Sequence, residues 1–178
     1  GGSLVLAGDA TITSDGGTQT INTSISGSYA LLKEGPGTVV LGAINIYTGL
    51  TNIQQGVLQL ANNYALDFSN VDVDVDNGLN IGTLNPMLGG LSGIGNLDIG
   101  PQTLTVGNDN QAAEYAGTLS GSGRIAKIGY GAWTITGSIA DTLAVSIGGH
   151  GVVTFAGYNT NAGTTTVASG SALNITSV

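Results

Sequence analysis

Residues 26–41 read SGSYALLKEGPGTVVL, and a related phrase, SGSGRIAKIGYGAWTI, occupies residues 120–135. Both phrases open on Ser-Gly-Ser and carry a Lys-x-Gly-x-Gly core, and the second copy lies 94 residues further along the chain. Internal similarity of this kind is typical of proteins built from stacked repeating units. We therefore expect an elongated stack with a long surface rather than a globule around a single deep pocket.

The composition is that of a folded chain with little charge. Of the 178 residues, 41% are hydrophobic and 8% are charged, whereas disordered chains are usually rich in charge and poor in apolar side chains. Glycine contributes 31 residues but proline only 3, which excludes collagen. The polar surface must therefore consist mainly of Thr, Ser and Asn.

The charge balance excludes several classes of partner. The chain has 11 acidic and 3 basic residues and a net charge of −8, so it lacks the cationic surface that nucleic acids and anionic membranes require. It has no cysteine, which excludes disulfides and thiolate metal sites. No apolar run is long enough to span a membrane. Residues 1–4 do not resemble a signal peptide, so we expect such a peptide to have been removed or to lie outside this sequence.

Short apolar–polar alternations separated by glycines run through the whole chain. VLQL at residues 57–60 and VDVDV at residues 71–75 are examples, and this period of two predicts half-buried β-strands. No window has the spacing of an amphipathic helix, and each interior glycine would cost a helix about 1 kcal/mol. The sequence therefore predicts an all-β chain.

A sandwich, a barrel and a solenoid can all be built from many short strands, but three features favour the solenoid. The strands are often only three or four residues long, aromatic residues make up 5% of the chain, and the sequence repeats internally. Turns of a parallel β-solenoid stack at ~4.8 Å, so turns of somewhat over 20 residues predict about 7 to 9 turns and a rod of about 35–45 Å. We expect glycines at the corners of these turns.

Residues 31–60 resemble the autotransporter-associated β-strand repeat, also called the passenger-associated transport repeat. LLKEGPGTVVL at residues 31–41 and NIYTGLTNIQQGVLQL at residues 45–60 are similar to the family pattern L-x-K-x-G-x-G-T-L-x-L followed by N-x-Y-x-G-x-T-x-[IV]-x-x-G-x-L-x-[LV]. In the second copy an extra stretch, residues 138–148, separates the two halves, and the second half resumes at residues 158–170. The repeat-motif positions in the two copies are Lys33, Gly35, Gly37, Gly49, Gly56, Lys127, Gly129, Gly131, Gly163 and Gly170.

This resemblance implies a right-handed, single-stranded parallel β-helix over residues 1–178, with repeat copies near 26–60 and 120–175 and spacer turns at 61–119. It further implies export across a bacterial envelope and display on the outer-membrane surface or release, as a stalk for adhesion. We expect no catalysis, no cofactor and no membrane insertion by this segment. Its expected partners are host or matrix glycans, and other solenoid ends or faces in self-association.

The ends of the sequence lead to a hypothesis about self-association. Neither end shows a polar cap, and exposed solenoid edges favour pairing with another chain. Head-to-tail stacking into filaments is therefore one hypothesis, and a fragment of a longer passenger explains the same ends.

Asp72, Asp74 and Asp76 are the candidate metal ligands. Alternation predicts that they share one face of a strand, where three close carboxylates would repel unless a hard cation such as Ca²⁺ supplied counter-charge. The calcium-binding nonapeptide repeat is absent, and a solvated acidic face explains the same residues. A carbohydrate- or Ca²⁺-binding surface around them is the alternative function.

The remaining candidates favour structural roles. Lys33 and Lys127 each precede a Gly-x-Gly corner, so we expect the stem of each to pack on the coil while its ammonium reaches solvent or a carbonyl. Polysaccharide lyases and hydrolases also use parallel β-helices, but glycoside hydrolysis needs two facing carboxylates. Arg124 and a lone His150 between two glycines do not supply them. The Thr-x-Thr pairs are irregularly spaced, which indicates outward strand threonines rather than an ice-binding ladder.

Overall fold

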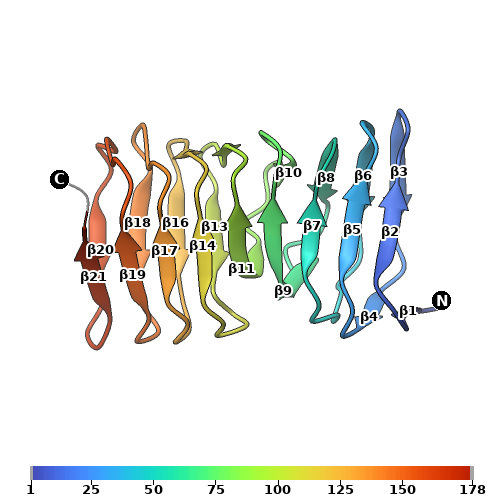
Figure 1. Ribbon diagram of the computed structural model, residues 1–178, viewed down its shortest axis with the longest axis horizontal. Helices are drawn as coiled ribbons and strands as arrows, with labels where there is room; N and C mark the ends of the chain where they lie inside the picture. Colours follow the sequence, from blue (N-terminus) through green and yellow to red (C-terminus); the bar gives the residue numbers. More distant parts are fainter. Residues whose placement is uncertain (1, 177–178) are drawn as a thin grey trace.

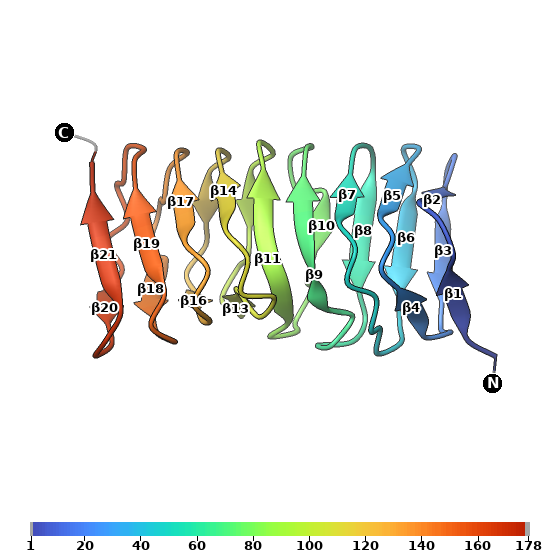
Figure 2. The same cartoon turned by 60° about the horizontal axis from the view of Figure 1, so that its bottom comes forward.

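The computed structural model describes residues 2–176, and in that range it contains 21 β-strands and no helix. The strands form three rows along a stack of successive turns (Figures 1 and 2). Row A, which faces the viewer in Figure 1, consists of β2 (Ala10–Thr13), β5 (Leu31–Glu34), β7 (Thr51–Ile53), β9 (Leu66–Val73), β11 (Met87–Gly93), β14 (Ala113–Tyr115), β17 (Trp133–Ile135), β19 (Val152–Phe155) and β21 (Ala172–Ile175).

The other two rows close the stack behind row A. Row B consists of β1 (Leu4–Leu6), β4 (Ile25–Gly27), the first residues of β9 and β11, β13 (Thr103–Val106), β16 (Arg124–Lys127), β18 (Ala144–Ile147) and β20 (Thr165–Val167). Row C consists of β3 (Thr18–Ile21), β6 (Thr38–Leu41), β8 (Val57–Leu60), β10 (Leu79–Asn80), β12 (Leu97–Asp98) and β15 (Leu119–Ser120). The strands β9 and β11 are long because they pass from row B into row A without a break.

Each turn passes through the rows in the order B, A, C, and neighbouring turns pair their strands in parallel. The nine strands of row A pair in sequence from β2 to β21, and residues that pair in register along this row, from Ile12 and Lys33 to Ile175, lie 20 to 22 residues apart. The stack therefore has nine turns, which at ~4.8 Å each form a rod of about 43 Å. This confirms the predicted all-β parallel solenoid.

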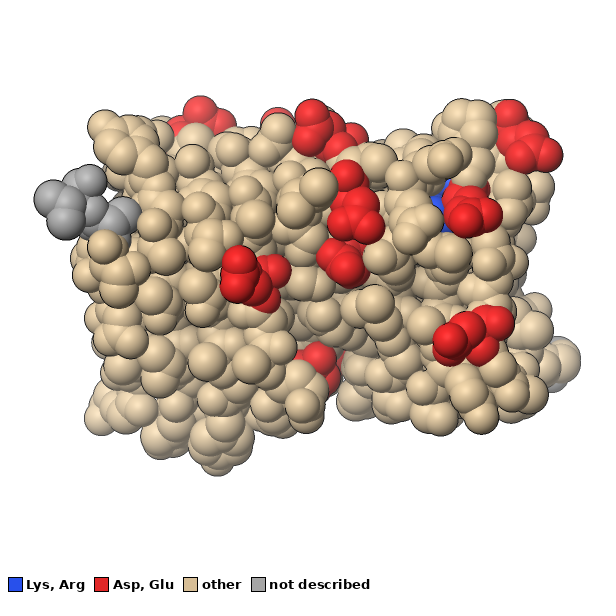
Figure 3. Space-filling view, in the orientation of Figure 1, with Lys and Arg blue, Asp and Glu red and all other residues tan. Residues whose placement is uncertain are grey.

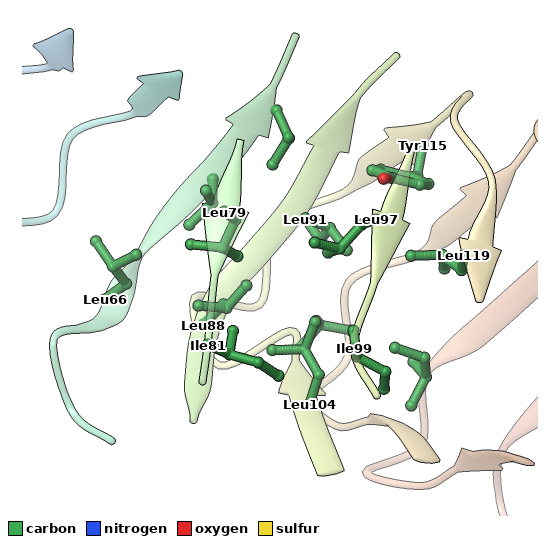
Figure 4. Close-up of a cluster of buried hydrophobic side chains, with 14 of the residues drawn as sticks. Leu66, Leu79, Ile81, Leu88, Leu91, Leu97, Ile99, Leu104, Tyr115 and Leu119 are labelled. Carbon is green, nitrogen blue, oxygen red and sulfur yellow. The ribbon is translucent and has the colours of Figure 1, made fainter. Parts of the chain in front are cut away.

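Columns of aliphatic side chains fill the interior of the stack. Figure 4 shows Leu66, Leu88 and Leu104, from three successive turns, together with other leucine and isoleucine side chains, and all the labelled residues are almost completely buried. Period-two alternation along each short strand directs these side chains inward, and each buried aliphatic side chain stabilises the fold by about 1.5–3 kcal/mol. Buried aromatic side chains keep their polar atoms paired. Trp133 Nε1 donates to the carbonyl oxygen of Leu91 at 2.9 Å, two turns away.

The two copies of the Lys-x-Gly-x-Gly phrase lie in different rows. Lys33 lies in β5 of row A, whereas Lys127 lies in β16 of row B. The reason is that the 94-residue offset is not a whole number of turns. Four turns from Lys33 lead in register to Tyr115, and Lys127 lies a further twelve residues, or two strands, along the chain.

The interruption of the second copy is one complete turn. Asn45 in the first copy corresponds to Asn159 in the second, an offset of 114 residues, which exceeds the 94-residue offset of the lysines by the 20 residues of one turn. Both asparagines make the same contact, because the Oδ1 of each accepts the backbone N–H of a residue 20 positions earlier, Ile25 at 2.8 Å or Ile139 at 3.1 Å. The inserted turn is therefore longer than the extra stretch expected at residues 138–148, because it also includes β19.

Candidate functional sites

Lys33 lies in the interior of the solenoid, where its ammonium group holds a glycine corner together. The side chain is 1% exposed, and Nζ donates to the carbonyl oxygens of Glu34, Gly35 and Gln55 at 2.8–2.9 Å. Gln55 belongs to the next turn, so the ammonium group also bridges two turns. Burial lowers the pKa of Lys33, because it disfavours the charged form. The sequence predicts that this ammonium group reaches either solvent or a carbonyl oxygen, and in the structure it binds carbonyl oxygens.

Lys127 repeats this arrangement in row B. It is 2% exposed, and Nζ donates to the carbonyl oxygens of Ile128 and Gly129, the latter at 3.2 Å. Burial lowers the pKa of Lys127, and the nearby carboxylate of Asp109 opposes that shift. Both lysines therefore stabilise corners, whereas Arg124, the third Lys or Arg residue of the sequence, has an exposed side chain.

The motif glycines occupy the corners, for two physical reasons. Gly35 and Gly129 have φ values of 75° and 71°, a conformation that L side chains rarely adopt. At Gly49 and Gly163 the obstacle is space, since a Cβ would overlap the backbone of the preceding turn, at Tyr29 and Leu143 respectively. The remaining motif glycines, at which a Cβ would also overlap neighbouring atoms, are Gly37, Gly56, Gly131 and Gly170.

Two of the three candidate calcium ligands lie together, and the third lies apart. Asn52 Nδ2 donates to Asp72 Oδ2 at 3.4 Å and to Asp74 Oδ2 at 3.2 Å, so these two carboxylates share one amide on the outer face of row A. Asp76 lies at the following corner, where its Oδ1 accepts the backbone N–H of Asn96 at 2.8 Å. Burial raises the pKa of Asp72, the charge of Asp74 raises it further, and a hydrogen bond with Ser92 opposes both effects.

The acidic side chains of this region cluster near the middle of the face that Figure 3 shows. Within residues 2–176, no group of three or more His, Asp or Glu side chains is placed so that it could hold a metal ion. Calcium binding at Asp72, Asp74 and Asp76 stays a prediction, and calorimetry with Ca²⁺ tests it.

Arg124 and His150 lie at separate positions on the surface. Arg124 begins β16, and its side chain is exposed. His150 lies at an exposed corner with φ of 63°, and its ring stacks on Tyr130, with a centroid distance of 5.9 Å and an interplanar angle of 23°. His150 is therefore a corner residue between two glycines.

A buried polar network joins two successive turns near the first repeat. Tyr47 Oη is hydrogen-bonded to Thr51 Oγ1, which is hydrogen-bonded to Ser69 Oγ at 2.7 Å, and Ser69 donates to the carbonyl oxygen of Gly49 at 2.6 Å. Burial raises the pKa of Tyr47 to about 12, against the effect of these hydrogen bonds. The network satisfies polar groups of the interior, and it presents no reactive group to solvent.

The surface feature that sequence reasoning missed is a groove of about 520 Å³ at the corners between rows B and A. One wall carries the exposed side chains of Leu50 and Phe68, and the other is the corner at residues 108–112. Figure 3 shows the lower edge of the molecule hollowed near its middle, below the acidic cluster. The sequence signal that marks this place is the Gly89-Gly90 pair, which reads as one more corner among many.

The class of protein follows from this geometry. Nine parallel turns, glycine corners and buried corner lysines define a β-solenoid built from repeats. Within the described range, residues 2–176, we find no helix with the length and apolar character needed to cross a membrane.

Comparison with known proteins identifies the particular repeat. Residues 31–60 match the family model of the passenger-associated-transport-repeat. The chain is also similar to the adhesin BmaC autotransporter of Brucella suis biovar 1 (strain 1330), with 33% identity over 133 residues, which is 68% of this chain and 4% of that protein. The chain thus spans only a small part of the length of this relative. No solved structure matches the chain. Residues 31–60 are an autotransporter passenger repeat, as their resemblance to that family predicts.

Proposed function

We propose that the chain is a structural segment of an extracellular, autotransporter-like surface protein, in which it acts as a stiff stalk that presents a surface for adhesion or self-association. The observation that carries the proposal is the continuous pairing of nine strands along row A, which joins every turn to the next by backbone hydrogen bonds. The passenger repeat at residues 31–60 and the similarity to an adhesin autotransporter support it.

The mechanism is mechanical rather than chemical. Each turn of the solenoid contacts its neighbours along all three rows, so bending the rod would break several backbone hydrogen bonds and open the aliphatic interior at once. The surface of this rod consists mainly of neutral Thr, Ser and Asn side chains, since only 8% of the residues are charged. We propose that this segment has no catalytic role. The alternative of a lyase or hydrolase predicts activity on acidic polysaccharides, which an assay of the purified chain tests.

The exposed strand edges of the first and last turns support self-association of the chain. Val5 in β1 and Ile175 in β21 are exposed apolar side chains, and β2 and β21 each pair with one neighbour within row A. Exposed strand edges of this kind pair readily with further β-structure. Such edges would accept further turns of a longer polypeptide or the end of a second copy.

Surface display tests the stalk. The chain is inserted between the signal peptide and the membrane barrel of an autotransporter, and the displaying cells are assayed for protease-accessible chain and for adherence to host cells or matrix. We expect exposed, protease-resistant chain and increased adherence relative to cells that display the barrel alone. Chain that stays inside the cell, or exposed chain without adherence, would overturn the corresponding part of the proposal.

Electron microscopy of the purified chain tests self-association. We expect filaments with an axial repeat near the height of one subunit, about 43 Å. Dispersed short rods at all concentrations would contradict head-to-tail stacking.

A further inference from the structure

The groove at the corners between rows B and A arises from an abrupt change in corner length. In β11 the corner between the row B residues and the row A residues consists of only Gly89 and Gly90. In the next turn the same corner is longer and consists of residues 107–112. Gly89 has no room for a side chain, because a Cβ there would overlap the backbone of Ser69, and a Cβ at Gly90 would displace the side-chain amide of Asn70. One recessed turn therefore lies between two turns that project.

The projecting corner is held in place by hydrogen bonds. Asn108 Nδ2 donates to the carbonyl oxygen of Asp67 at 2.9 Å. The backbone N–H of Asp109 donates to the carbonyl oxygen of Gly89 at 3.1 Å. Within the corner, Asp109 Oδ1 accepts the backbone N–H of Gln111 at 2.9 Å. Because the Asn108 bond reaches two turns back and the Asp109 bond reaches the neighbouring turn, the groove is preformed and needs no ordering when a ligand enters.

The two walls of the groove have different chemistry. On one wall, Phe68 is 43% exposed and Leu50 is 37% exposed, so an aromatic and an aliphatic side chain present apolar surface to the groove. On the other wall lie two primary amides and a carboxylate, those of Asn108, Gln111 and Asp109. An amide offers a donor and an acceptor side by side, and a carboxylate offers two acceptors.

This combination matches a sugar ring. A pyranose has an apolar C–H face that packs on an aromatic ring, and its edge carries neighbouring hydroxyls, each of which is both a donor and an acceptor. Clefts of about 300–1,000 Å³ with an apolar lining and a few placed polar groups are the usual small-molecule sites of proteins, and this groove has about 520 Å³.

The negative charge of the groove favours neutral sugars over acidic ones. Asp109 lies in the groove, the chain carries a net charge of −8, and two of its three basic side chains are buried at corners. Sialic acids, uronic acids and sulfated sugars would bring like charge to the Asp109 carboxylate, and the nearby ammonium of Lys127 is buried and donates to carbonyl oxygens of its own corner. A neutral ligand avoids this repulsion, and its hydroxyls can donate to the Asp109 carboxylate.

We propose that this groove binds a short neutral glycan, with one ring against Phe68 and Leu50 and its hydroxyls on Asn108, Asp109 and Gln111. The inference rests on the proposed adhesive function, because it names the ligand class that such a stalk would contact. The site is distinct from the carboxylates of Asp72, Asp74 and Asp76.

A glycan array with the purified chain is the first test. We expect binding to neutral hexose-containing glycans, at least tenfold weaker binding in Phe68→Ala, and loss of binding in Ala112→Trp, whose indole fills the groove. Tyr130→Ala is the matched control, because Tyr130 is an exposed aromatic residue (72%) at a corner outside the groove. Each variant is first checked for cooperative unfolding above the assay temperature, so that a loss of binding is not a loss of folding.

The outcomes separate the groove from the adhesive function. Absence of neutral-glycan binding by the wild-type chain, preference for acidic glycans, or equal loss of binding in Tyr130→Ala would overturn the groove proposal. If displayed cells adhere but neither Phe68→Ala nor the bound neutral glycan reduces adherence, the groove proposal fails while the adhesive function stands. If the purified chain binds glycans but displayed cells do not adhere, the adhesive function fails while the groove stands.

Discussion

The corner at Lys33 and the corner at Lys127 have the same local structure on different faces of the solenoid. In both, a buried ammonium group donates to carbonyl oxygens of the corner, and the second residue after the lysine is a glycine with positive φ. The first lies between rows A and C, the second between rows B and A. The phrase therefore encodes a strand–corner–strand unit, and the number of residues between the copies sets the face that each copy occupies.

A three-row stack accepts this unit on more than one face because the corners have equivalent surroundings. Each corner after the first turn has a preceding turn to pair with, and each flanking strand directs alternate side chains into the same aliphatic interior. The complete turn inserted in the second copy shows the same tolerance. Whole turns can therefore be added or removed, whereas fractions of a turn move every later strand to another face.

Deleting part of a turn is expected to have the largest effect. Removing residues 138–157 takes out 20 residues, one complete turn, so Tyr158 takes the place of Ser138, and this deletion should leave a shorter solenoid that still unfolds cooperatively. Removing only residues 138–147 shifts all later strands to the wrong row and should abolish the ordered turns after β17. Circular dichroism, guanidinium unfolding and limited proteolysis measure the difference. Equal stability of the two deletions would show that register between turns does not hold this end of the stack together.

Replacing each buried lysine is expected to lower the free energy of unfolding in proportion to the number of hydrogen bonds that the lysine donates. Lys33→Met removes the donor from three carbonyl oxygens and should cost about 3 kcal/mol of unfolding free energy, whereas Lys127→Met removes it from two and should cost about 2 kcal/mol. Methionine keeps most of the stem volume, so the difference reports on the ammonium group. Urea unfolding of both variants measures it, and an equal or reversed order would contradict the comparison of the two corners.

The paired asparagines should each show a smaller loss of stability than the lysine of the same copy, again with the larger loss in the first copy. Asn45 is buried and links three turns, through the N–H of Ile25 and the carbonyl of Ala65, so Asn45→Ala should cost about 2–3 kcal/mol. Asn159 is half-buried and bonds the N–H of Ile139 and the carbonyl of Gly157, so Asn159→Ala should cost about 1 kcal/mol. Thermal unfolding gives both values. A larger loss for Asn159→Ala would mean that exposure does not weaken this contact.

The smallest expected effect is a pH dependence that comes from the spacer between the copies. Burial raises the pKa of Asp67 and Asp72 above the ordinary value of 3.8, so the folded chain binds protons more tightly there than the unfolded chain. Their contribution to stability is therefore complete below about pH 3.8 and is lost as the pH rises through the raised pKa values. We expect the melting temperature to rise by a few °C between pH 7 and about pH 4.

Matched variants isolate these two carboxyls. Asp67→Asn and Asp72→Asn should each reduce the rise in melting temperature, whereas Asp15→Asn, at an exposed corner, should leave it unchanged. A melting temperature that falls on acidification in the wild-type chain would contradict the assignment.

Much of the fold could be predicted because its rules are local. Alternation in segments such as residues 57–60 predicts strands, and Gly35 and Gly129 lie at the corners where their spacing from the lysines places them. The turn length of 20–22 residues agrees with the expected range, and so does the total of nine turns. For Lys33 the sequence leaves two positions open for the ammonium group, solvent or a carbonyl oxygen, and in the structure three carbonyl oxygens of the interior hold it.

The candidate groove could not be predicted from the same rules. Phe68 and Asn108 are 40 residues apart, and they face one groove because two turns of particular lengths separate them. For Asp72, Asp74 and Asp76 the local pattern predicts more proximity than the structure gives. Alternation predicts one shared face, but the strand ends at Val73, so Asp76 lies at the next corner.

Strand, corner and interior positions depend on residues within a few places of one another, so hydrophobic alternation and glycine spacing were sufficient to identify a parallel β-solenoid with passenger repeats. The face that each copy occupies, the burial of Lys33 and Lys127, and the groove beside Phe68 depend on the summed lengths of several turns. A change of one or two residues in any corner alters which side chains meet in the next turn. These features therefore became visible only when the turns were stacked in register.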